Sequence, residues 1–168
     1  IEYKLNFDSA LAKKSVELFL LEEAESKYRR WLAEFKEFKE AKLLILFGSV
    51  LRKEKDYNDI DLVVVVEQGN FKALEKLIEE KNAILLKHVH PVWQSHADLK
   101  RNLRKRDPVI LDALKTGVVL KGESELVEVV GSVALNIAFP KPTLVDNVAL
   151  MLKLPSRENL SVRLALRS

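Results

Sequence analysis

Two short apolar runs constrain the fold more than any other feature of this sequence. Residues 42–47 read Lys-Leu-Leu-Ile-Leu-Phe, and residues 63–66 are four consecutive valines. Both runs are too short and too apolar for a surface helix, whereas a strand that is covered on both faces needs this composition. We therefore expect two buried strands in an α/β (α+β) fold, with a small mixed sheet flanked by helices.

Other segments predict the helices and strands around these two. Residues 1–6 alternate and predict a short strand, and Asn82 is expected to end a helix that Asn70 begins. Periodicity and the residues that start and stop helices place the remaining elements, which are helices at 8–21, 22–39, 70–80, 96–104, 108–115 and 123–130 and strands at 83–93 and 118–120.

An aromatic stripe marks the second of these helices. Its members recur at helical spacing and share one face: Tyr28, Trp31, Leu32, Phe35 and Phe38. Such a face belongs to the core far more often than it binds a ligand, so we expect these side chains to be buried.

The composition excludes several classes of protein. The 168 residues include no cysteine, which rules out disulfides, thiol nucleophiles and cysteine-ligated zinc. No apolar run approaches the ~20 residues that are needed to span a bilayer. These features favour a cytoplasmic protein without a membrane partner.

The character of the chain changes near residue 131. Residues 1–130 hold 23 basic and 23 acidic residues, whereas residues 131–168 hold five and two and so supply the net charge of +3. Apolar alternation predicts three strands in this tail, at 133–139, 145–153 and 160–166.

The predicted organisation therefore has three parts. Residues 1–39 form an N-terminal strand and helices, residues 40–130 form the core domain, and residues 131–168 form a β-rich tail. The tail is either foreign sequence or an appendage whose exposed apolar strands pair copies of the chain into a homo-oligomer.

Polar residues at the ends of the two apolar runs suggest a chemistry. Asp59 and Asp61 are two apart on an extended segment, so their side chains point the same way. Two adjacent carboxylates stay ionised together when a cation such as Mg²⁺ or Mn²⁺ lies between them. They are therefore the candidate metal ligands.

The first run ends in a second set of candidates. Gly48 permits a tight turn, and Ser49 adds a hydroxyl at the expected N-terminus of a helix, where N–H groups and a positive dipole favour a phosphate. Arg52 and Lys53 follow within one turn and can reach the same anion. The candidate metal ligands and the candidate phosphate-binding residues are thus expected to meet at the ends of adjacent strands.

These residues resemble the signature of the DNA polymerase beta-like nucleotidyltransferase superfamily. The resemblance rests on Leu46-Phe47-Gly48-Ser49-Val50-Leu51-Arg52 and on Asn58-Asp59-Ile60-Asp61-Leu62, and it is greatest to the minimal prokaryotic and archaeal branch. It covers roughly residues 40–125.

The resemblance implies an enzyme that transfers a nucleoside monophosphate from a nucleoside triphosphate such as ATP to a hydroxyl on a protein, an RNA or a small molecule. It implies that metal ions on Asp59 and Asp61 steady the triphosphate, with Mg²⁺ or Mn²⁺ as cofactor. It also implies a toxin–antitoxin setting with a toxin protein as partner.

One position departs from the family pattern. The third carboxylate of such domains usually lies on the next core strand, but here that strand reads Leu-Lys-His-Val-His-Pro-Val over residues 86–92 and has no acid. His90 takes the acid's place by position. Histidine can ligate Mn²⁺ or act as a base, but it suits Mg²⁺ poorly.

Two alternatives follow from this departure and from the first residues. The chain is either a nucleotide-binding or regulatory module that has lost catalysis, or a DNA-linked regulator in which residues 1–6 end a winged-helix domain. A further run, Lys100-Arg101-Asn102-Leu103-Arg104-Lys105-Arg106, is interpreted as a solvated helix face, with a basic rim for RNA or for an acidic protein as the alternative.

Overall fold

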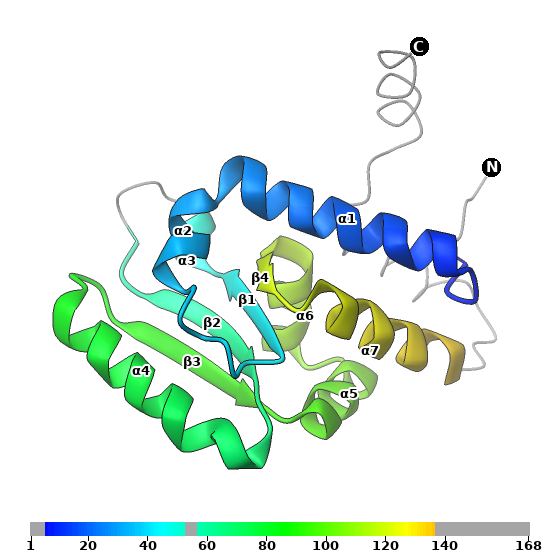
Figure 1. Ribbon diagram of the computed structural model, residues 1–168. Helices are drawn as coiled ribbons and strands as arrows, with labels where there is room; N and C mark the ends of the chain where they lie inside the picture. The colour runs from blue at the N-terminus through cyan, green and yellow to red at the C-terminus, as the bar shows by residue number, and fades with distance from the viewer. Residues whose placement is uncertain (1–5, 53–56, 137–168) are drawn as a thin grey trace, which may run out of the picture.

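A four-stranded mixed sheet with helices on both faces forms the centre of the computed structural model, which describes residues 6–52 and 57–136 (Figure 1). The sheet order is β3-β2-β1-β4. Along the chain the elements are α1 (Ala10–Lys27), α2 (Arg29–Glu34), β1 (Leu43–Phe47), α3 (Ser49–Arg52), β2 (Ile60–Val65), a 3-10 turn (Gln68–Asn70), α4 (Phe71–Ile84), β3 (Val89–Gln94), α5 (His96–Lys105), α6 (Pro108–Thr116), β4 (Val118–Lys121) and α7 (Glu123–Asn136).

The two apolar runs are the central strands, as the sequence predicts. β1 is antiparallel to β2 and to β4, and β2 is parallel to β3. Successive residues of β1 point to opposite faces of the sheet, and all five are buried because each face carries a helical layer. The predicted fold class is therefore confirmed.

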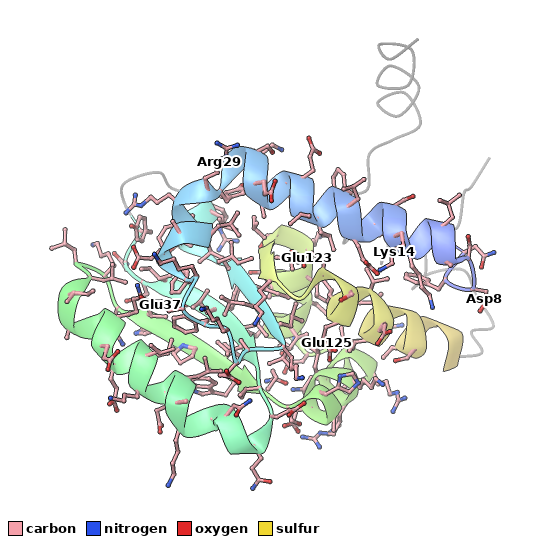
Figure 2. All side chains as sticks on the ribbon, viewed as in Figure 1. Asp8, Lys14, Arg29, Glu37, Glu123 and Glu125 are labelled. Carbon is pink, nitrogen blue, oxygen red and sulfur yellow. The ribbon has the colours of Figure 1, made fainter. Side chains whose placement is uncertain are left out.

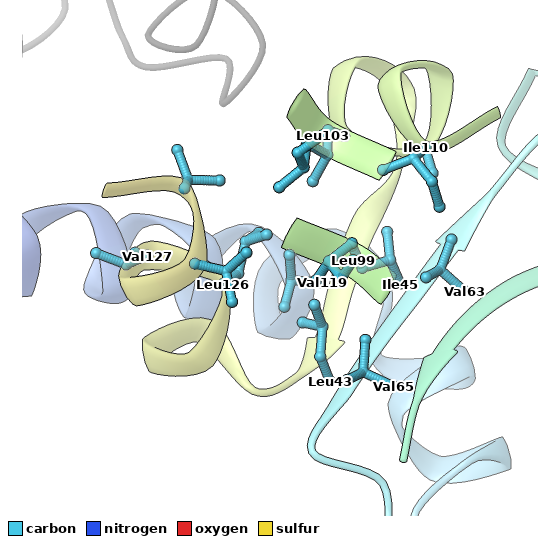
Figure 3. Packing of buried hydrophobic residues seen from close by; sticks show 14 of the residues in the cluster. Leu43, Ile45, Val63, Val65, Leu99, Leu103, Ile110, Val119, Leu126 and Val127 are labelled. Carbon is cyan, nitrogen blue, oxygen red and sulfur yellow. The ribbon is translucent and has the colours of Figure 1, made fainter. Parts of the chain in front are cut away.

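One hydrophobic cluster fills the space between the sheet and helices α1, α5, α6 and α7. Leu43 and Ile45 of β1 contribute to it, together with Val63 and Val65 of β2 (Figure 3). The helices add further buried side chains, among them Val16, Leu99, Leu103, Ile110, Leu126 and Val127. Helix α1 also lies along β4 and so shields that edge of the sheet.

A second cluster covers the opposite face with α2 and α4. Trp31, Phe35 and Phe38 are buried there, and Trp31 stacks on Phe35 with ring centroids 6.1 Å apart. Tyr28 and Leu32 are partly buried beside them. The aromatic stripe is thus core, as expected.

Charged side chains occupy the outside of both layers. Arg29 points outward at the start of α2 (Figure 2), and Glu37 is exposed in the turn after that helix. Within the described residues no polar or charged side chain is buried. The same residues contain no helix that is long and apolar enough to cross a membrane.

The boundary between the first two helices differs from the prediction. Helix α1 continues through residue 21 to Lys27. It ends at Tyr28, whose N–H donates a hydrogen bond to the carbonyl of Ala24. Helix α2 then ends at Glu34, five residues before the expected end. The predicted stop at residue 21 was wrong because no strong breaker lies there and Ala24 packs in the core.

A second correction concerns Asn82, which does not end a helix. Helix α4 runs on to Ile84, and the Asn82 side chain bonds both the N–H and the carbonyl of Val89, at 2.7 and 3.3 Å. This clamp ties the end of α4 to the start of β3. The strand therefore begins at Val89, whereas it was predicted to begin at residue 83.

The last correction concerns the start of the tail. The strand predicted at 133–139 is wrong over its first four residues, since α7 extends to Asn136 and Val133 is buried in the first cluster. The strands predicted at 145–153 and 160–166, and the strand at 1–6 except for Asn6, lie outside the described residues.

Candidate functional site

A glycine turn packed against a carboxylate forms the centre of the candidate site. Phe47, the last residue of β1, lies opposite Asp61 of β2. The next residue, Gly48, has a φ of 81°, and a Cβ on it would lie 2.2 Å from Oδ2 of Asp61. Glycine suits this position because the φ lies in the left-handed region and because a side chain here would displace the Asp61 carboxylate.

Parallel pairing of β2 with β3 brings His90 to the same place. The register sets Asp61 beside His90, and Nε2 of His90 lies 3.8 Å from Oδ1 of Asp59, which directly precedes β2. His88 lies just before β3, where its carbonyl accepts from the N–H of Ile60. The structure thus brings together Gly48, Asp59, Asp61 and His90, four residues that the sequence marked.

Asp61 experiences the strongest electrostatic perturbation in this cluster. Burial raises the pKa of its carboxyl above the usual range, and the nearby Asp59 and Asp112 add to the rise. His90 and Arg52 act in the opposite direction. A half-buried carboxyl beside other acids gains from any cation that binds next to it.

Arg52 and Asp112 complete the group of charges. Arg52 ends α3, and its Nη1 lies 3.9 Å from Oδ2 of Asp112 on α6. Asp112 was not among the sequence candidates. The only local signal for it is that it is the one acid in the helix Pro-Val-Ile-Leu-Asp-Ala-Leu-Lys-Thr.

The remaining candidates have different positions. Ser49 is half-buried at the first position of the short helix α3, and Lys53 lies outside the described residues. His96 contacts Glu125 instead of the cluster. The basic run lies on α5, which begins beyond the C-terminal end of β3, whereas His90 lies near the N-terminal end of that strand.

The cluster is a partial donor set for a cation. Asp59 and Asp61 offer carboxylate oxygens, the ligands that Mg²⁺ and Mn²⁺ prefer. Among residues 6–52 and 57–136, no three His, Asp or Glu side chains form a group that could hold a metal by itself. A cation here would therefore need oxygen ligands from another source, such as a phosphate.

A family model for the nucleotidyltransferase domain matches residues 28–115, more than half of the 168-residue chain. The matched range runs from the end of α1 into α6 and includes every residue of the cluster. Searches among curated proteins and among solved structures return no match. By this family match, supported by a mixed α/β fold of the expected kind, the chain belongs to the nucleotidyltransferase-domain family.

Proposed function

We propose that this chain transfers a nucleoside monophosphate from a nucleoside triphosphate to a hydroxyl acceptor, with Mg²⁺ or Mn²⁺ as cofactor. The observation that carries the proposal is the packing of the Gly48 turn against Asp61, beside Asp59 and Arg52. An acid pair and the Arg52 guanidinium lie at a tight glycine turn, and a metal-bound triphosphate needs carboxylates for its metal and a positive group for its phosphates.

Asp59 and Asp61 are the residues that would hold the metal. Magnesium sites commonly use one or two protein carboxylates and complete their shell with water and substrate phosphates. Two carboxylates without a third protein ligand therefore fit a metal that arrives with the nucleotide. When bound, the metal supplies positive charge that neutralises the phosphate oxygens during transfer.

The other residues bind phosphate and manage a proton. Arg52 and the Gly48–Ser49 turn hold the phosphates, with Lys53 as a further candidate. The acceptor oxygen forms a bond to the α-phosphorus, the bond from that phosphorus to the bridging oxygen breaks, and pyrophosphate leaves. His90, next to Asp59, is the candidate base that takes the hydroxyl proton.

The acceptor is a protein, an RNA or a small molecule. The resemblance to minimal transferases favours a protein acceptor, namely a toxin that the chain modifies as its antitoxin partner. The triphosphate substrate and the cysteine-free sequence favour the cytoplasm as the place of action.

Calorimetry with ATP in the presence and absence of Mg²⁺ tests the site. We expect Asp59→Asn and Asp61→Asn to abolish the metal-dependent part of ATP binding, because each removes a charged metal ligand. Asp8→Asn, on the exposed turn before α1, is the matched control. Unchanged metal dependence in both site variants would show that the site lies elsewhere.

His90 supports a second candidate function, that of a nucleotide-binding regulatory module with weak or no transfer. Transfer of labelled nucleotide to a cell extract distinguishes the two functions and identifies the acceptor. If His90 is a poor substitute for an acid, transfer is weak or requires Mn²⁺, and His90→Asp raises it in Mg²⁺. Strong wild-type transfer in Mg²⁺ that His90→Asp abolishes would instead make His90 a catalytic residue.

A further inference from the structure

Asp112 and Arg52 form a loose contact between two elements that are far apart in the sequence. Arg52 ends the helix after the glycine turn, and Asp112 lies in the middle of α6. Their closest atoms, Nη1 and Oδ2, are 3.9 Å apart, and both side chains are about half exposed. This distance is too long for a hydrogen bond, so the contact is an ion pair without fixed geometry.

Among residues 6–52 and 57–136, the charges that act on Asp61 include two other carboxylates and one guanidinium. Asp59 and Asp112 both lie within electrostatic range of Asp61, and Arg52 is the arginine that acts on Asp61. A triphosphate that enters this site brings further negative charge. The guanidinium of Arg52 can then form short, paired bonds to phosphate oxygens, which are stronger than a 3.9 Å contact to an exposed carboxylate.

We propose that Asp112 is a positioning residue that holds Arg52 at the edge of the site in the nucleotide-free protein and releases it to the triphosphate. This inference rests on the proposed function. Asp112 and the triphosphate thus compete for the guanidinium of Arg52. The Asp112 carboxylate keeps Arg52 beside Asp61, and the same contact lowers the affinity for the nucleotide.

The competition predicts how two substitutions combine. Asp112→Asn should lower the Kd for Mg-ATP about two- to five-fold, the range expected when an exposed ion pair no longer has to be broken. Arg52→Gln should raise the Kd. In the Arg52→Gln background, Asp112→Asn should lower the Kd much less, because the group for which Asp112 competes is missing and only its repulsion of the phosphates is relieved.

Calorimetry on the full chain measures this cycle, with ATP and with inorganic tripolyphosphate in excess Mg²⁺. Both probes should respond equally, since Arg52 binds phosphate and not the base. Asp112→Glu keeps the charge and should restore the wild-type Kd. Glu80→Gln is the matched control. It breaks an exposed ion pair between Glu80 and Lys76, both of which lie on α4 and not on α3 or α6.

Three results would overturn the inference. An equal gain from Asp112→Asn with and without Arg52 would mean that Asp112 only repels the nucleotide. Weaker binding in Asp112→Asn would mean that Asp112 holds the metal or that its pair with Arg52 organises the site for the nucleotide. If the wild type binds neither ATP nor tripolyphosphate with Mg²⁺ or Mn²⁺, the proposed function itself fails, and this inference fails with it.

Discussion

Gly48→Ala is the substitution whose effect follows most directly from the structure. A residue other than glycine pays about 1–2 kcal/mol for the left-handed region, into which the φ of 81° falls. The new Cβ would also lie 2.2 Å from Oδ2 of Asp61, a distance that real atoms do not adopt. The carboxylate is the free end of a side chain, so it can turn away at a further cost of about 1 kcal/mol.

These two terms give an expected loss of about 2–3 kcal/mol in the free energy of unfolding, or about 4–12 °C in Tm. Because Asp61 is a metal ligand in the proposed function, displacement of its carboxylate should also weaken Mg-ATP binding by about ten- to a hundred-fold, the range seen when the groups that orient metal ligands are removed. Thermal unfolding measures the first effect, and calorimetry on the folded protein measures the second.

Two other glycines separate stability from binding. Gly69→Ala places its Cβ in open space and should change neither quantity. Gly122 has a φ of 85°, and its Cβ would lie 2.0 Å from the carbonyl oxygen of Lys42, at the end of β1 away from Gly48. Gly122→Ala should therefore destabilise the protein yet leave nucleotide binding intact. Wild-type ATP affinity in Gly48→Ala would refute the reasoning.

Three further predictions concern charge, the strand register and the tail. Burial raises the pKa of the Asp61 carboxyl in the folded protein, so the fold loses stability as the pH rises from the ordinary value of 3.8 through that raised pKa. Asp61→Asn should therefore raise Tm at pH 7, and the gain should vanish below the ordinary value of 3.8, where both states are protonated; an equal gain at every pH would contradict this. Asn82→Ala leaves the backbone of Val89 without its partner and should cost about 1–3 kcal/mol in urea unfolding, whereas no loss would show that the clamp is dispensable. Removal of residues 137–168 after Asn136 should retain ATP binding and reduce self-association in light scattering, and a monodisperse monomer of the intact chain would exclude a role of the tail in pairing.

The parts of the fold that sequence could predict are those whose signal is local. The central strands and the buried face of Trp31, Phe35 and Phe38 each follow from one short pattern of apolar residues. The prediction for Asn82 was wrong because its side chain accepts a hydrogen bond from the N–H of Val89. Helix propensity describes one residue at a time and does not include such a partner. Residues 133–136 were misjudged because alternation and helical spacing coexist there, and packing of Val133 in the core favours the helix.

The candidate site shows the same division. Gly48, Asp59 and Asp61 belong to a spaced motif, so their proximity could be expected before the strand register was known. Asp112 follows Arg52 by 60 positions and has no motif around it. Only the packing of α6 against β1 brings it to the site, and that is a tertiary contact.

The position of Asp61 explains why the site is built at a cost to the fold. Its neighbours along β2, Ile60 and Leu62, are buried on the opposite face, which fixes the alternation and turns Asp61 toward Gly48. The side chain therefore cannot move fully into water without breaking the strand register that the apolar neighbours enforce. A carboxylate held half-buried near two other acids is destabilising in the free protein, and a bound cation would reverse that cost. Under the proposed function, the residue whose burial costs the fold stability is thus one that a bound metal would stabilise.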